Sequence, residues 1–203
     1  LPFCFSQQKA VQGHYFLYTP KEAKKDAHCI VFLHGSGGNF LFYIWVLKQA
    51  FPDAVIIAPS WAACWSVDGV GYLKDAVQDA ARRLKVPLRS KWLMAISGGG
   101  DAGFRIAAQT PKAYEGFISI ASAPTDDTIR KLNKDMRVLM INGTRDRRFP
   151  IRSVRQQATF ARPQCGSLQL RELDADHFFL VTKQAETTKI LRGFIKKQGS
   201  AGW

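Results

Sequence analysis

The sequence predicts an α/β fold, with a doubly wound and mostly parallel sheet, formed by one domain over residues 1–203. Short apolar runs rich in β-branched residues alternate with helix-like segments, which is the pattern of a parallel α/β sheet. Several of these runs are continuously apolar, as expected of strands that helices cover on both faces. No repeat, low-complexity tract or long linker divides the 203 residues, and this length suits a single domain.

Seven segments are expected to form strands, because several are short, continuously apolar runs and several contain β-branched residues. They are residues 15–18, 29–33, 54–58, 92–96, 116–120, 138–141 and 168–173.

Five segments between these runs are expected to form helices. They are residues 40–50, 70–84, 101–109, 151–160 and 183–196. The second places Val70, Leu73 and Ala76 at helical spacing, and the third stops before Pro111. Right-handed crossovers would wind such helices onto both faces of the sheet, and ligands then bind at the carboxyl ends of the strands.

The charge of the chain is unusual, with 29 Lys and Arg against 16 acidic residues and a formal net charge of +13. Such an excess favours anionic surfaces. The basic residues are scattered and no nucleic-acid-binding motif accompanies them, so we expect weak association with anionic surfaces and no specific nucleic-acid site. No apolar run approaches the roughly 18 residues that a transmembrane helix needs.

The four cysteines, Cys4, Cys29, Cys64 and Cys165, form no C-x-x-C pair, which argues against a zinc site and a thioredoxin-like motif. Cys29 lies in an apolar run and is expected to be a buried thiol. The other three fall in terminal or loop segments where a disulfide could form.

The chain begins at Leu1, either because a signal segment was removed or because the sequence was trimmed. We expect export to the periplasm or the exterior, with the cytoplasm as the alternative.

Ser97 is the candidate nucleophile. An apolar strand runs into it and a helix-compatible segment follows, with Ala95 two residues before it and Gly99 two residues after. Small residues at these positions permit the sharp, strained turn that lifts a nucleophile above a sheet edge. The alternative is a Gly-rich phosphate loop or simple turn, but the P-loop pattern is absent here.

A second glycine-rich loop, residues 34–38, follows an earlier strand. Acyl transfer needs backbone N–H donors aimed where the carbonyl oxygen becomes negative. We expect the N–H groups of Ser36 and Gly98 to form this oxyanion hole. His34 is expected to brace the loop by hydrogen bonding, without acting as a base.

Asp146 follows a buried strand and is the candidate for the acid that orients the histidine. The alternative is a turn aspartate paired with Arg145, Arg147 or Arg148.

His177 is the candidate base, since it alone among the four histidines follows the last strand and precedes the final helix. The alternative is a structural histidine packed against its neighbouring phenylalanines. Asp174 and Asp176 are weaker candidates for the acid, because so close a neighbour rarely reaches the outer ring nitrogen.

The chain order Ser97, Asp146, His177, together with the loop that begins at His34, resembles the α/β-hydrolase superfamily over nearly the whole chain. The resemblance implies a serine esterase with a Ser-His-Asp triad.

Within that superfamily, residues 65–72, 109–111 and 122–124 resemble the polyhydroxybutyrate depolymerase and feruloyl esterase branch, and the phospholipase/carboxylesterase branch is similar too. Ala95 and Gly98 depart from the first branch, which often has Gly and Asn there, and this loosens the analogy of substrate.

Residues 121–136, where many relatives insert a helical lid, are few, so we expect an open, lidless cleft. Its walls would include Trp61, Trp65, Phe149 and Phe178, although ordinary core packing is the alternative for each. Such a cleft suits small acyl esters or the end of a polymer chain.

The expected chemistry is ester hydrolysis through an acyl-enzyme, with no metal or organic cofactor. A peptidase or thioesterase could use the same triad, and a non-catalytic binding protein on a hydrolase fold is a further alternative.

Overall fold

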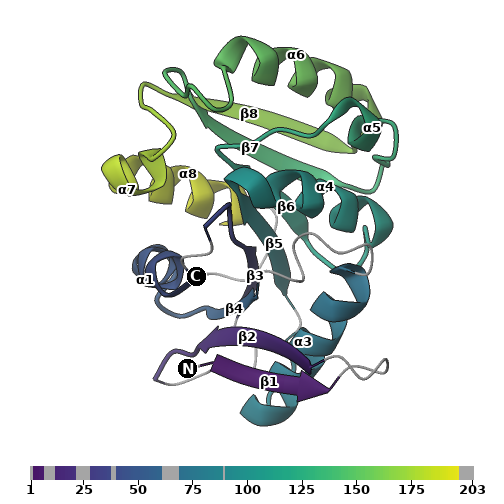
Figure 1. Cartoon of the computed structure of the whole chain (residues 1–203), viewed down its shortest axis with the longest axis vertical. Helices are drawn as coiled ribbons and strands as arrows, with labels where there is room; N and C mark the ends of the chain where they lie inside the picture. Colours follow the sequence, from purple (N-terminus) through teal and green to yellow (C-terminus); the bar gives the residue numbers. More distant parts are fainter. Residues whose placement is uncertain are drawn as a thin grey trace.

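The computed structural model describes residues 2–6, 12–21, 28–37, 40–60, 69–88 and 90–196. These residues form one sheet of eight strands (Figure 1). The spatial order is β1 (Pro2–Ser6), β2 (Gln12–Tyr18), β4 (Val55–Pro59), β3 (Cys29–Leu33), β5 (Lys91–Ile96), β6 (Gly116–Ile120), β7 (Arg137–Gly143) and β8 (Ser167–Leu173). The pairs from β4 to β8 are parallel, whereas β1 and β2 add antiparallel strands at one edge. The predicted mostly parallel sheet is therefore confirmed.

All seven predicted strands are present, several of them one to three residues longer at an end than predicted. The strand that the sequence does not predict is β1, which pairs with β2 from Pro2 opposite Phe16 to Ser6 opposite Gln12. It is a short edge strand that begins at a proline, a residue that strands tolerate at such places.

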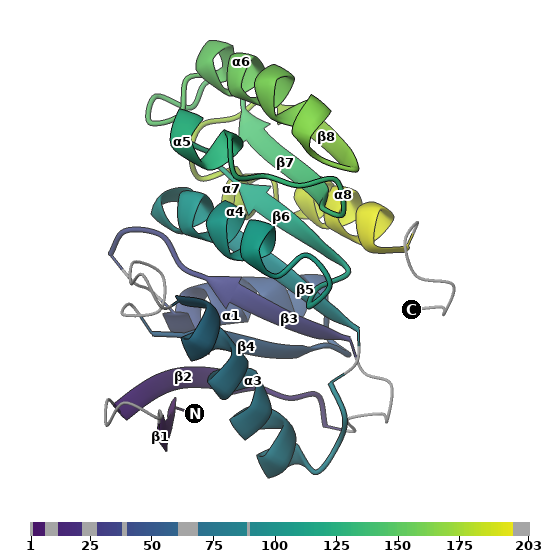
Figure 2. The ribbon, with the colours of Figure 1, turned by 90° about the vertical axis from the view of Figure 1, so that its right-hand side faces the viewer.

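Helices cover both faces of the sheet, as the doubly wound prediction requires (Figure 2). The helices are α1 (Phe40–Ala50), α3 (Gly69–Leu84), α4 (Gly100–Gln109), α5 (Asp126–Ile129), α6 (Ile151–Ala161), α7 (Phe179–Thr182) and α8 (Gln184–Lys196). The five predicted helices are present, and the single turns α5 and α7 are additional. None of the helices in the described ranges is long and apolar enough to cross a membrane.

Two apolar layers hold the helices to the sheet. On one face α3, α4 and α6 pack on the strands, with Phe104 of α4 edge-on to Phe117 of β6 at 4.7 Å between ring centroids. On the other face α1, α7 and α8 pack, with Phe194 of α8 edge-on to Trp92 of β5 at 5.7 Å. Strands buried on both faces are continuously apolar for this reason.

The chain changes winding direction between the neighbouring strands β3 and β5. The helix after β3 is α1, on one face of the sheet, and the helix after β5 is α4, on the other (Figures 1 and 2). Such a change of winding direction marks the position at the carboxyl edge where open α/β sheets bind ligands. Ser97 and the loop at His34 are the segments that follow these strands.

Residues 121–136 form no cap. Their only helix is the single turn α5, which lies between α4 and α6 (Figures 1 and 2). The Asp101 carboxylate of α4 holds it there by accepting hydrogen bonds from the Thr125 backbone at 3.0 Å and the Thr128 hydroxyl at 2.7 Å. The predicted absence of a lid in this stretch is confirmed.

Two cysteines are buried free thiols. Cys29 was expected to be one, and burial raises its pKa to about 12. Cys165 was expected to be open to disulfide formation, and that expectation is wrong: it packs into the core beside Leu168, and burial raises its pKa to about 11. Cys64 lies outside the described residues.

A buried polar network joins β2 to α3. The Tyr15 hydroxyl donates to the Asp79 carboxylate at 2.7 Å, and the Arg83 guanidinium donates to the same oxygen at 2.6 Å. Burial raises the pKa of Asp79, but the hydrogen bonds from Arg83 and Tyr15 outweigh it and hold the pKa below its usual value. Asp79 is therefore bound as a carboxylate.

Asp79→Asn should lower the free energy of unfolding at pH 7 by about 1–3 kcal/mol, because hydrogen bonds to a charged group are lost. The pKa of Asp79 is depressed in the folded chain, so its stabilisation is complete above the unfolded value of about 4 and is lost as the pH falls through the folded value. Urea unfolding of both proteins at pH 7 and pH 3 should thus show a difference that shrinks in acid. Asp127→Asn removes an exposed carboxylate and should behave like wild type. An equal effect of the two substitutions would contradict the network's role.

Candidate active site

Ser97 sits at a sharp turn where β5 ends at Ile96 and the chain enters a 3₁₀ turn (Ser97–Gly99) that continues into α4. Its φ is 51°, in the left-handed region that disfavours side-chain-bearing residues. Such strain persists only where the surrounding structure enforces it, and it gathers at functional sites. The expected strained elbow is thus present, and it presents a partly exposed hydroxyl at the carboxyl edge of the sheet.

Three side chains from separate loops meet in a hydrogen-bonded chain. The His177 Nε2 atom lies 2.9 Å from Ser97 Oγ, and its Nδ1 atom lies 2.7 Å from Asp146 Oδ2. A carboxylate only accepts hydrogen bonds, so Nδ1 carries the proton and Nε2 is left to accept one from the serine. The His177 side chain is 11% exposed and that of Asp146 is fully buried. This arrangement can remove the proton from Ser97 while the imidazole stays in one tautomer.

Asp146 is held by its own turn. Its Oδ1 atom accepts backbone hydrogen bonds from Arg148 at 2.8 Å and Phe149 at 3.0 Å, which leaves Oδ2 for His177. The alternative of a turn aspartate paired with an arginine is not what is found, since Arg145 instead pairs with Asp174 at 3.1 Å. Aspartate at the start of a turn commonly accepts the N–H groups two and three residues on, a signal that the sequence contains.

The two weaker candidates for the acid are engaged elsewhere. Asp174 is exposed and binds Arg145, and Asp176 accepts the backbone N–H of Phe178 at 2.9 Å.

The loop after β3 lies directly against the elbow. A Cβ placed on Gly35 would be 3.0 Å from Ser97 Cβ and 3.6 Å from its Oγ, so glycine is what allows this approach. His34 is buried, and its Nδ1 lies 2.7 Å from the Gly35 carbonyl, which braces the loop as expected. Burial lowers the pKa of His34, against the opposing effect of that hydrogen bond. Ser36 is exposed beside it, and the convergence of the Ser36 and Gly98 N–H groups stays a prediction.

The substitution Gly99→Ala tests this contact between the loop after β3 and the elbow at Ser97. A Cβ there would lie 2.4 Å from the His34 carbonyl oxygen and 3.0 Å from that of Leu33, both of them backbone atoms. Gly99→Ala should therefore destabilise the chain by about 1–3 kcal/mol, because the elbow or the loop must shift.

The matched control for Gly99→Ala is Gly193→Ala in α8, where an added Cβ meets nothing within 4 Å. It should stabilise the chain by roughly 0.5–1 kcal/mol, as expected for Gly to Ala in a helix. Urea unfolding would measure both, and changes of the same sign would contradict the close approach of loop and elbow.

Two of the four predicted aromatic wall residues flank His177. Phe149 stacks on the imidazole at 5.9 Å with an interplanar angle of 12°, and it also packs against the core. Phe178 meets the ring edge-on at 5.6 Å and is 58% exposed, so core packing does not account for it. Trp61 and Trp65 lie outside the described residues.

A groove of about 610 Å³ opens beside His177, between the turn that holds Asp146 and the start of α7. Its lining consists of Arg145, Arg147 and Arg148 with residues 175–178, 182 and 183. The sequence analysis considered these arginines only as partners of Asp146 and did not predict the groove. The signal was the cluster of three arginines directly after a strand.

No protein-family model and no curated protein matches this sequence. Solved structures, in contrast, match over nearly the whole chain. A protein of unknown function from Agrobacterium tumefaciens, described as a candidate α/β hydrolase, superposes with a TM-score of 0.77 at 19% identity and covers 98% of both chains. An esterase from Pyrococcus furiosus has a TM-score of 0.74 at 11% identity, covering 98% of this chain and 92% of its own.

Esterase 2 from Thermogutta terrifontis, in a form phosphonylated by cyclosarin, has a TM-score of 0.69 at 16% identity and covers 98% of this chain and 94% of its own. The TM-scores and the coverage of these matches define the architecture. The chain has the α/β-hydrolase fold.

Proposed function

We propose that this chain is a serine hydrolase that cleaves carboxylic esters, with Ser97 as nucleophile, His177 as general base and Asp146 as the residue that orients the imidazole. The observation that carries the proposal is the hydrogen-bonded chain from Ser97 through His177 to Asp146, at 2.9 and 2.7 Å, with Ser97 strained at the carboxyl edge of the sheet. A nucleophile within reach of a base that a third group orients is the usual arrangement for covalent catalysis.

Acylation would begin when Ser97 Oγ attacks the ester carbonyl carbon and passes its proton to His177 Nε2. The carbonyl oxygen becomes negative in the tetrahedral intermediate, where the N–H groups of Ser36 and Gly98 would stabilise it. The intermediate collapses as the carbon–oxygen bond to the alcohol breaks, and the alcohol takes the proton from Nε2. Asp146 stabilises the imidazolium throughout without taking a proton.

Deacylation would repeat these steps with water. His177 Nε2 removes a proton from a water molecule, which attacks the acyl carbon, and the Ser97 oxygen leaves with that proton. The products are the carboxylic acid and the free enzyme. Every proton moves between substrate, water, Ser97 and His177, so the steps as written require no metal or organic cofactor.

Esters are favoured over other acyl compounds for two reasons. Residues 121–136 add no helical cap to the site, which suits small or polymer-end esters. The solved structures with this fold include proteins described as esterases from Pyrococcus furiosus and Thermogutta terrifontis.

A fluorophosphonate probe tests the nucleophile, since such probes phosphonylate an activated serine. Wild-type protein should be labelled and Ser97→Ala should not. A folded wild-type sample that takes no label would favour the non-catalytic binding protein. Matched ester, thioester and anilide substrates would then separate an esterase from a thioesterase or peptidase. The esters should include p-nitrophenyl esters of increasing chain length and feruloyl and hydroxybutyrate esters.

A further inference from the structure

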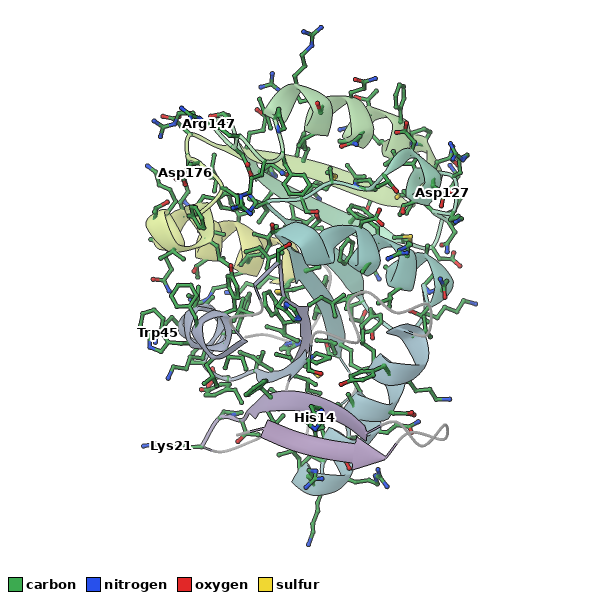
Figure 3. The ribbon with its side chains drawn as sticks, in the orientation of Figure 1. His14, Lys21, Trp45, Asp127, Arg147 and Asp176 are labelled. Carbon is green, nitrogen blue, oxygen red and sulfur yellow. The ribbon has the colours of Figure 1, made fainter. Side chains whose placement is uncertain are left out.

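The groove beside His177 carries an excess of positive charge. Four of its lining side chains are cationic, namely Arg145, Arg147, Arg148 and Lys183, against the single carboxylate of Asp176. Arg147 and Asp176 lie at the same corner of the molecule (Figure 3). Since a concave wall of one charge sign concentrates ligands of the opposite sign, the groove is suited to an anionic group.

Three of these cations are exposed and available to a ligand, namely Arg147, Arg148 and Lys183. Arg145 is neutralised by Asp174, with its guanidinium 3.1 Å from that carboxylate. Arg147 and Arg148 are exposed, and no carboxylate within the described ranges pairs with either guanidinium. Asp146, which lies between the arginines in sequence, is fully buried and bound to His177 and to two backbone N–H groups.

The backbone of the turn that carries the arginines is fixed in relation to the reacting atoms. The backbone N–H of Arg148 donates to Asp146 Oδ1 at 2.8 Å, and Asp146 Oδ2 holds His177 at 2.7 Å. In ester cleavage the departing alcohol must lie within reach of His177 Nε2 to take its proton. His177 also lines the groove, so an alcohol half held at Nε2 can extend past the imidazole toward the groove while the acyl half is attached to Ser97.

We infer that this site prefers esters whose alcohol half bears an anionic group, a carboxylate or a phosphate, bound by Arg147 and Arg148. The inference rests on the proposed ester hydrolysis. Guanidinium groups bind both anions through paired N–H donors, which gives direction as well as charge. Phe178, exposed at the rim, would cover the apolar part of the alcohol.

The test compares isosteric substrates that differ only in charge. The pair 3-acetoxybenzoate and 3-acetoxybenzamide places a carboxylate or a neutral amide on the leaving phenol. Monophenyl succinate and phenyl succinamate do the same on the acyl half, and 3-acetoxyphenyl phosphate supplies the phosphate. Wild type should show a kcat/KM about tenfold or more higher for 3-acetoxybenzoate than for 3-acetoxybenzamide, consistent with hydrogen bonds to a charged group. The succinate pair should show no such preference.

Arg147→Gln combined with Arg148→Gln should remove that preference, and added salt should weaken it in wild type. Both substitutions keep the Arg148 N–H that supports Asp146. The control is Arg162→Gln with Lys189→Gln, two exposed cations outside the groove, which removes the same charge and should keep the preference.

Three results would overturn the inference. Equal rates for 3-acetoxybenzoate and 3-acetoxybenzamide in an active wild type would exclude it while leaving ester hydrolysis intact. A preference confined to the succinate pair would place the anion on the acyl half, and a preference lost equally in the control would reflect net charge alone. No turnover of any substrate, together with no fluorophosphonate labelling, would instead reject the proposed function itself. A higher kcat/KM for 3-acetoxyphenyl phosphate than for 3-acetoxybenzoate would identify phosphate as the preferred anion.

Discussion

Ser97→Ala should lower kcat for ester hydrolysis by at least about 10⁴-fold while the chain stays folded. The hydroxyl is the only group lost, and its oxygen lies 2.9 Å from His177 Nε2. Alanine keeps the Cβ and so keeps the strained elbow at φ 51° much as it is. Turnover of a p-nitrophenyl ester measures the effect, and urea unfolding verifies the fold.

The control for this prediction is Ser153→Ala, an exposed serine of α6 far from the elbow in sequence. It should hydrolyse the same ester at the wild-type rate. Near-normal turnover in a folded Ser97→Ala protein would show that Ser97 is not the nucleophile, whatever the geometry around it.

The fold was predictable because its signals are local. A buried parallel strand is continuously apolar, so β3 and β6 could be bounded from sequence without error. Strand β1 was missed because a five-residue edge strand has little local pattern, and its partner β2 is what makes it a strand. Cys165 was expected to be open to disulfide formation because it lies in a loop, the one before β8, and its burial in the core is tertiary packing that no local signal records.

Part of the candidate site was likewise predictable from sequence and part of it was not. Ser97, Asp146 and His177 could be singled out because each directly follows a strand, and parallel strands bring their carboxyl ends to one edge. The groove could not be foreseen, since it forms where the 145–148 turn meets the start of α7, about 30 residues later in the chain. Which guanidinium groups remain available depends on Arg145 pairing with Asp174, and that pairing is set by the tertiary fold.

His177→Ala should be as damaging as Ser97→Ala, because within the described residues its Nε2 atom is the base that lies in hydrogen-bond reach of the serine hydroxyl. His14→Ala, an exposed position of β2, which β4 and β3 separate from β5, should have little effect on turnover. Comparable losses in the two variants would contradict the assignment of the base.

Asp146→Asn should lower kcat on the order of 10³–10⁴-fold without unfolding the chain, as expected when the imidazole is held in the wrong tautomer. The reason lies in the turn. The backbone N–H groups of Arg148 and Phe149 both donate to Oδ1, so the amide oxygen of asparagine must take that position. The amide nitrogen then points at His177 Nδ1 and donates to it, which forces the ring proton onto Nε2. With Nε2 protonated, the imidazole can no longer accept the proton of Ser97.

The matched control is Asp174→Asn, which removes an exposed carboxylate only 3 residues before His177 but bound to Arg145. Turnover of one neutral ester, measured at saturating concentration, compares the two variants directly. A larger loss for Asp174→Asn, or for Asp176→Asn, would mean that a neighbouring carboxylate orients the imidazole during catalysis. A large loss confined to Asp146→Asn would show that catalysis needs the His177 tautomer with the proton on Nδ1. Of the three carboxylates compared, Asp146 is the one whose two backbone donors determine which way an amide would face.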